Sequence, residues 1–108
     1  MLKNQMETSN EFFQIVYLVV KKIPIGKVTT YGIIAEYFGN RGKARHVGYA
    51  LNSVIGLDIP CHRVVNRSGE LSGSPHFETP TLMRELLESE KVEFIKDKVN
   101  LKKHLWKP

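Results

Sequence analysis

The residues best suited to covalent chemistry lie in one short segment, IPCHRVV (residues 59–65). Its Cys61 is the only cysteine of the chain and stands between a proline and a histidine, whereas a packing cysteine is expected among apolar neighbours. A thiol becomes a nucleophile when positive charge lowers its pKa or a base takes its proton. We interpret Cys61 as a candidate nucleophile, with His62 and Arg63 as the nearby base and cation. An inert thiol is the alternative, because adjacent strand residues point to opposite faces.

The cysteine content, the apolar runs and the length predict where the protein works and how many domains it has. A single cysteine cannot form an internal disulfide, and no C-x-x-C or H-x-x-x-H spacing predicts a metal site, so we expect a reducing cytoplasm. The N-terminus lacks an apolar signal core, and the longest apolar run, residues 15–20, is too short to cross a bilayer. The length of 108 residues predicts one domain, residues 1–108, with a core over 10–94 and a tail over 95–108.

The positive charge is concentrated in two segments. The formal net charge is +5, and residues 39–57 contain Arg41, Lys43 and Arg45 but no acidic residue. Residues 59–69 are also free of acidic residues and contain Arg63 and Arg67. Such segregation is what a phosphate-facing surface requires, although two solvated loops would show the same pattern.

Capping signals and apolar periodicity predict three helices in the first half of the chain. Thr8 is the expected N-cap of a helix that ends near Lys22, and Thr29 or Thr30 that of a helix over about 31–38. Glycines interrupt the pattern before a third helix over about 43–53.

The second and third predicted helices form a candidate helix-turn-helix. In that motif the second helix enters a DNA groove with its N-terminal residues leading, which here are Lys43, Arg45 and His46. Gly48 and Ala50 are small enough to allow close approach of another backbone.

The second half predicts a wing and a further helix. Residues 58–73 indicate a strand or loop followed by a turn at 66–69 that resembles a wing. Thr79 and Pro80 are the expected N-cap and first residue of a helix, and the tail predicts a short strand followed by irregular structure. The predicted fold class is therefore α/β, mostly helical, with a winged helix-turn-helix.

Four strings, GKVTTYGIIAEYFGN, ARHVGYAL, IPCHRVV and LLESE, occur in this order. Together they resemble the DNA-binding and active-site domain of the O6-alkylguanine-DNA alkyltransferases and their alkyltransferase-like relatives, over about residues 10–94. The resemblance implies direct damage reversal: minor-groove binding, rotation of the damaged guanine out of the stack, and transfer of its O6-alkyl group to the cysteine. Each molecule would act once, without a cofactor or a metal.

The resemblance also implies roles for individual residues. Cys61 corresponds to the acceptor thiol, His62 to the residue that activates it through water, and Glu90 to the glutamate behind the histidine. Arg45 corresponds to the arginine that fills the space of the extruded base, and Tyr31 to the tyrosine that turns the nucleotide.

The sequence departs from the transferase pattern after the wing. A Tyr-Ser-Gly-Gly-like stretch is replaced by LSGSPHFETP, where Ser72 and Ser74 are partial substitutes, and Asn52 lies near the position of the family's hinge asparagine. The short chain and its C-terminus look more like the alkyltransferase-like proteins, which typically have tryptophan or alanine in place of Cys61.

Three functions therefore stay open. The first is single-turnover alkyl transfer by a monomer bound to double-stranded DNA that contains alkylated guanine, and we favour it because Cys61 and His62 are both present. The second is a lesion sensor without chemistry that recruits nucleotide excision repair proteins. The third is a winged-helix transcription regulator, which leaves IPCHRVV unexplained.

Overall fold

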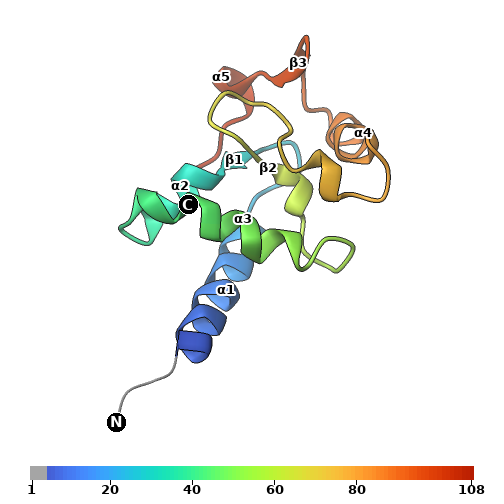
Figure 1. Cartoon of the computed structure of the whole chain (residues 1–108). Helices are drawn as coiled ribbons and strands as arrows, with labels where there is room; N and C mark the ends of the chain where they lie inside the picture. Colours follow the sequence, from blue (N-terminus) through green and yellow to red (C-terminus); the bar gives the residue numbers. More distant parts are fainter. Residues whose placement is uncertain (1–4) are drawn as a thin grey trace.

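The computed structural model describes the backbone of residues 5–108 and side chains from residue 11 onwards (Figure 1). The α-helices are α1 (Gln5–Lys21), α2 (Tyr31–Tyr37), α3 (Ala44–Asn52), α4 (Leu82–Ser89) and α5 (Leu101–His104). The strands are β1 (Thr29–Thr30), β2 (Val64–Val65), β3 (Phe94–Ile95) and β4 (Lys98–Val99). Three 3-10 helices lie at Arg41–Lys43, Cys61–Arg63 and Ser74–His76. None of the helices within residues 5–108 is long and apolar enough to span a membrane.

The long helix α1 supports the helix-turn-helix through one apolar stripe. It begins at Gln5, so the prediction that Thr8 caps it is wrong, and it ends within one residue of the predicted Lys22. Val16, Val19 and Val20 are buried in a core cluster that includes residues of α2 and α3. In Figure 1, α1 runs beneath α3.

The predicted helix-turn-helix is present. The Oγ1 atom of Thr30 accepts a hydrogen bond from the Ile33 amide at 3.1 Å, which confirms Thr30 as the N-cap of α2. The turn contains the Arg41–Lys43 3-10 helix, which begins where Asn40 Oδ1 accepts a bond from the Gly42 amide at 2.9 Å. Helix α3 then packs on both α1 and α2.

A parallel strand pair connects the helix-turn-helix to the cysteine segment. Thr29 and Thr30 of β1 pair with Val64 and Val65 of β2. Residues 58–65 were predicted as a strand or loop, and the structure has a single 3-10 turn at Cys61–Arg63 followed by the two-residue strand. The pairing fixes the cysteine turn beside the start of α2.

The predicted wing is a tight turn supported by the C-terminal tail. Asn66 Oδ1 accepts hydrogen bonds from the amides of Ser68 and Glu70, and Gly69 adopts a φ of +88°. The Val99 amide donates to the Gly69 carbonyl at 2.9 Å. The tail is more regular than predicted, because β3 and β4 form an antiparallel hairpin and α5 follows.

Helix α4 belongs to a second core cluster. Its Met83 and Leu87 are fully buried with residues of β2 and β4. The helix begins at Leu82 after Thr81, so the predicted start at Thr79 and Pro80 is too early. A hydrogen bond of 2.6 Å from Thr81 Oγ1 to the carboxylate of Glu85 in the first turn stabilises the observed start.

Candidate active site and nucleic-acid interface

Cys61 is the first residue of the 3-10 turn and its thiol is nearly enclosed. The residue is only 6% exposed, and its Sγ lies 3.6 Å from the Leu51 carbonyl, to which it donates. Burial raises the pKa of the Cys61 thiol to about 11. The thiol of the free protein is therefore protonated at neutral pH, and it reacts as a nucleophile only if a base takes its proton.

The predicted base and its carboxylate are in direct contact behind the cysteine. His62 Nε2 lies 2.9 Å from Glu90 Oε2, and the two side chains are only 12% and 14% exposed. Burial favours a higher pKa for Glu90, but hydrogen bonds from Arg63 and His62 outweigh it and hold the pKa below its usual value. An ionised Glu90 accepts the Nε2 proton, which leaves His62 Nδ1 free to act as a base.

Arg63 completes this group instead of contacting DNA. Its Nε and Nη2 atoms donate to the two oxygens of Glu90 at 3.0 and 2.8 Å, and its Nη1 donates to the Ile23 carbonyl at 2.9 Å. The Arg63 side chain is only 13% exposed. The prediction that Arg63 binds DNA is therefore wrong, because all three guanidinium nitrogens donate inside the protein.

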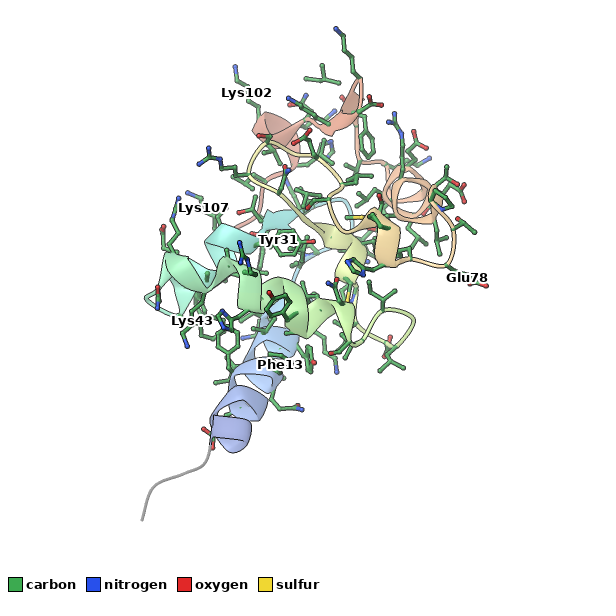
Figure 2. All side chains as sticks on the ribbon, in the orientation of Figure 1. Phe13, Tyr31, Lys43, Glu78, Lys102 and Lys107 are labelled. Carbon is green, nitrogen blue, oxygen red and sulfur yellow. The ribbon has the colours of Figure 1, made fainter. Side chains whose placement is uncertain are left out.

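A cavity of about 870 Å³, which we call the Cys61 cavity, opens in front of the thiol. It is lined by residues 55–63, residues 76–78, and Leu82 and Leu86 of α4, with Lys21 at the end of α1. Figure 2 shows Glu78 at the outer end of the 76–78 segment. No spacing signal in the sequence pointed to His76 or Phe77 as lining residues, since they follow the wing in the segment that departs from the transferase pattern.

A second hollow of about 540 Å³, which we call the basic groove, lies between the start of α2 and α3. Residues 30–33 form one wall, and Arg45, Gly48, Tyr49 and Asn52, spaced three or four residues apart, form the other. Arg41, Ala44 and the wing residues Asn66 and Arg67 complete the lining. The groove thus collects arginines from the helix-turn-helix and from the wing.

Two predicted interface residues, Ala50 of α3 and Lys43 directly before it, lie outside the basic groove. Ala50 is fully buried in the core, so it cannot approach a DNA backbone as predicted. Residues two positions apart in an α-helix lie about 200° apart around its axis. Gly48 and Ala50 therefore occupy opposite faces of α3. Lys43 does not line the groove, and its ammonium group lies 5.3 Å from the centre of the Phe12 ring.

Tyr31 lines the basic groove and also interacts electrostatically with Cys61. Burial raises the pKa of its hydroxyl, which hydrogen-bonds with Ser72, and the proximity of Cys61 raises the pKa further. A Cβ at Gly73 would lie 2.9 Å from this hydroxyl, so the glycine allows the loop to approach Tyr31. Ser72 and Ser74, the predicted partial substitutes in the base pocket, do not line the Cys61 cavity but a separate hollow beside Asn66 and Arg84.

The basic groove and the Cys61 cavity adjoin where Asn52 meets His76. Asn52 Nδ2 lies 3.3 Å from His76 Nε2; Asn52 lines the groove and His76 lines the cavity. The two hollows therefore meet at this pair of side chains. Among residues 5–108 no cluster of three histidine, cysteine, aspartate or glutamate side chains could hold a metal ion.

Comparison with known proteins agrees with this arrangement. Residues 11–92 match the family model described as 6-O-methylguanine DNA methyltransferase, DNA binding domain. Alkyltransferase-like protein 1 of Schizosaccharomyces pombe is 38% identical over 105 residues, covering 92% of this chain and 97% of its own. The DNA base-flipping protein of Vibrio parahaemolyticus is 37% identical over 92% of this chain and 99% of its own length.

The transferase relatives match over a shorter region. A methylated-DNA–protein-cysteine methyltransferase of Methanosarcina acetivorans is 44% identical over 64 residues, which are 58% of this chain and 41% of that protein.

The crystal structure of S. pombe Atl1 in complex with damaged DNA containing O6-carboxymethylguanine superposes with a TM-score of 0.80 and 37% identity over 92% of this chain and 97% of that one. With its helix-turn-helix, wing and enclosed Cys-His-Arg turn, the chain belongs to the family of the 6-O-methylguanine DNA methyltransferase DNA-binding domain.

Proposed function

We propose that this protein binds O6-alkylguanine in duplex DNA, rotates the base out of the helix, and transfers the alkyl group to Cys61 in a single turnover. The observation that carries the proposal is the position of the Cys61 thiol, in the wall of a cavity that adjoins the basic groove, with His62 and Glu90 behind it. The relative named as a DNA base-flipping protein supports the rotation of the base, and the relative named as a methyltransferase supports the transfer of the alkyl group.

Binding and base rotation are assigned to the basic groove. The exposed Arg45 on α3 is suited to occupy the gap left by an extruded base, and Gly48 leaves room for a DNA strand close to α3. Tyr31, at the boundary between groove and cavity, is placed to guide the rotating nucleotide. Lys43 contributes long-range attraction for phosphate at the edge of this surface.

Alkyl transfer is assigned to Cys61, His62 and Glu90. The sulfur attacks the alkyl carbon, a sulfur–carbon bond forms, and the bond from that carbon to guanine O6 breaks with its electron pair left on guanine. The thiol proton passes through a water molecule to His62 Nδ1, Glu90 stabilises the resulting imidazolium, and the proton is finally taken up by guanine N1. Because burial raises the pKa of Cys61 to about 11, this transfer requires the base.

A lesion sensor without chemistry is the second candidate. The same raised pKa of Cys61 favours it, since a thiol that stays protonated does not attack an ether carbon. The two relatives matched nearly end to end, named as an alkyltransferase-like protein and a base-flipping protein, also favour it. In that case the bound lesion would be passed to nucleotide excision repair proteins.

Intact-protein mass spectrometry after incubation with a duplex that carries one O6-methylguanine separates the two candidates. We expect a gain of one methylene in the wild type and none in Cys61→Ser, which should still bind the lesion. An unchanged mass together with lesion-selective binding would identify a sensor. Sequence-specific binding of undamaged duplex without lesion preference would refute both and point to a transcription regulator.

Arg45→Ala tests base extrusion in a gel-shift assay with paired damaged and undamaged duplexes. A residue that fills the gap of the extruded base stabilises only the damaged complex, so we expect the lesion preference to fall by about tenfold or more. Arg67→Ala, which removes an equal charge from the wing side of the same groove, should weaken both complexes to a similar degree. If Arg45→Ala weakened both complexes equally, Arg45 would contact only phosphate and would not fill the gap of the extruded base.

A further inference from the structure

We propose that Lys102 and Lys107 of the C-terminal tail form a second phosphate-binding surface, which extends the DNA contact from the basic groove along the flanking duplex. We call these two residues the tail lysines. The inference rests on the proposed DNA binding, but it concerns a segment beyond the helix-turn-helix and the cysteine site. Residues 100–108 contain four basic residues with Lys103 and His104 included, and no acidic residue.

The wing connects the segment that carries Lys102 to the lining of the basic groove. Arg67, on the wing turn, lines the basic groove, and Gly69 two residues later packs directly on the tail. A Cβ at Gly69 would lie 2.7 Å from the Val99 carbonyl oxygen and 3.5 Å from Leu101 Cγ. Helix α5 therefore begins against the back of the wing, and Lys102 is its second residue.

A separate set of hydrogen bonds places Lys107 next to the other wall of the groove. The Trp106 amide donates to the Val28 carbonyl at 2.7 Å, and the Val28 amide donates to the His104 carbonyl at 2.9 Å. Val28 leads directly into Thr30 and Tyr31, which line the groove. In Figure 2, Lys102, Lys107 and Lys43 follow one another along the same side of the molecule.

The segment that carries the tail lysines is held rigidly. Buried His104 lies between them, with its Nδ1 2.8 Å from the Gly26 carbonyl and its Nε2 3.0 Å from the Glu93 amide nitrogen. The Glu93 amide must donate to Nε2, so Nδ1 carries the proton and donates to Gly26. The backbone on both sides of His104 is thereby fixed to the body of the protein.

The tail lysines have no partner within the described part of the chain. Both are exposed and neither forms an ion pair or a hydrogen bond through its side chain there, whereas Lys103 between them pairs with Glu93. Duplex DNA presents one negative charge per about 1.7 Å of axis, so a duplex seated in the groove continues as a charged strip past the protein. The tail lysines supply cations beside the groove without base-reading groups, which matches contact with the backbone of flanking DNA.

The salt dependence of DNA binding tests this surface. We expect Lys102→Gln and Lys107→Gln each to reduce the slope of log K against log salt by about 0.9, which corresponds to about fivefold weaker binding at about 0.15 M salt. Damaged and undamaged duplexes should weaken equally, because phosphate contacts do not distinguish bases. Lys96→Gln removes the same charge from the tip of the β3–β4 hairpin, far from α2 and α3 in Figure 1, and should leave the slope unchanged.

Duplex length supplies a second readout. Shortening the duplex arm that reaches the tail lysines should abolish the difference between wild type and the Lys102→Gln/Lys107→Gln variant, whereas shortening the other arm should not. Wild-type slopes in both single variants would overturn the inference, as would a slope change equal to that of Lys96→Gln. Loss of lesion preference in the wild type would refute the proposed function and leave the salt slopes to decide the tail lysines independently.

Discussion

The enclosed thiol of Cys61 makes a quantitative prediction about its reactivity in the free protein. Burial raises the pKa from an ordinary 9.0 to about 11, so at about pH 8 the thiolate fraction falls from about 10% to about 0.1%. A more basic thiolate is also a better nucleophile, which recovers about tenfold of this hundredfold loss. We therefore expect iodoacetamide to modify native Cys61 at least about tenfold more slowly than the unfolded chain, with limited access to the buried sulfur slowing it further.

The assay is alkylation followed by intact-protein mass spectrometry, which is unambiguous because the chain has one cysteine. Rates are compared between native protein and protein unfolded in urea, from pH 7 to pH 10. Below the pKa the thiolate fraction rises about tenfold per pH unit, so the native rate should climb without a plateau across this range. A plateau with a midpoint below pH 9, or a native rate equal to the unfolded rate, would refute the reasoning and show a preformed thiolate.

Three further substitutions test the elements that position the site, each through the free energy of unfolding in urea. Glu90→Ala should cost about 2 kcal/mol or more at pH 7, because it leaves a largely enclosed arginine without its carboxylate. The native pKa of Glu90 is lowered, so this loss should shrink as the pH falls below the ordinary glutamate pKa of 4.5, and a loss that grows on acidification would contradict the assignment. His104→Ala should cost about 2–3 kcal/mol, because a buried side chain is removed and two partly buried backbone groups lose their partner, and a loss below about 0.5 kcal/mol would remove His104 as the anchor of the tail. Gly69→Ala should cost more than Gly39→Ala: both glycines have positive φ, but only at Gly69 would the new Cβ meet the Val99 carbonyl, and equal losses would disprove the close approach.

Local signals explain why much of the fold was predictable. Thr30 caps α2 through a bond to an amide three residues away, and the apolar spacing of α3 reflects a helical repeat, so both could be recognised within one or two turns. The same approach misplaced the start of α4, because the Thr79-Pro80 pair has the residue types of a helix start, whereas the observed helix follows Thr81, whose hydroxyl bonds to the Glu85 side chain and not to a backbone amide. Cys61 and His62 were identified because their residue types are chemically distinctive and adjacent.

The sequence by itself determined which side chains can do chemistry and where the helix-turn-helix lies. Only the tertiary structure decided that Arg63 turns inward to Glu90, 27 residues away, and that Ala50 faces the core. It also decided that Asn52 of the basic groove contacts His76 of the Cys61 cavity, and that the C-terminal tail packs on Val28 and on the wing. Caps and periodicity act over a few residues, whereas these contacts exist only after α4 and the tail have packed against the cysteine turn and the wing. A charged side chain that looks like a surface residue in the sequence can therefore be an internal partner, and lysines remote in sequence can extend a binding surface.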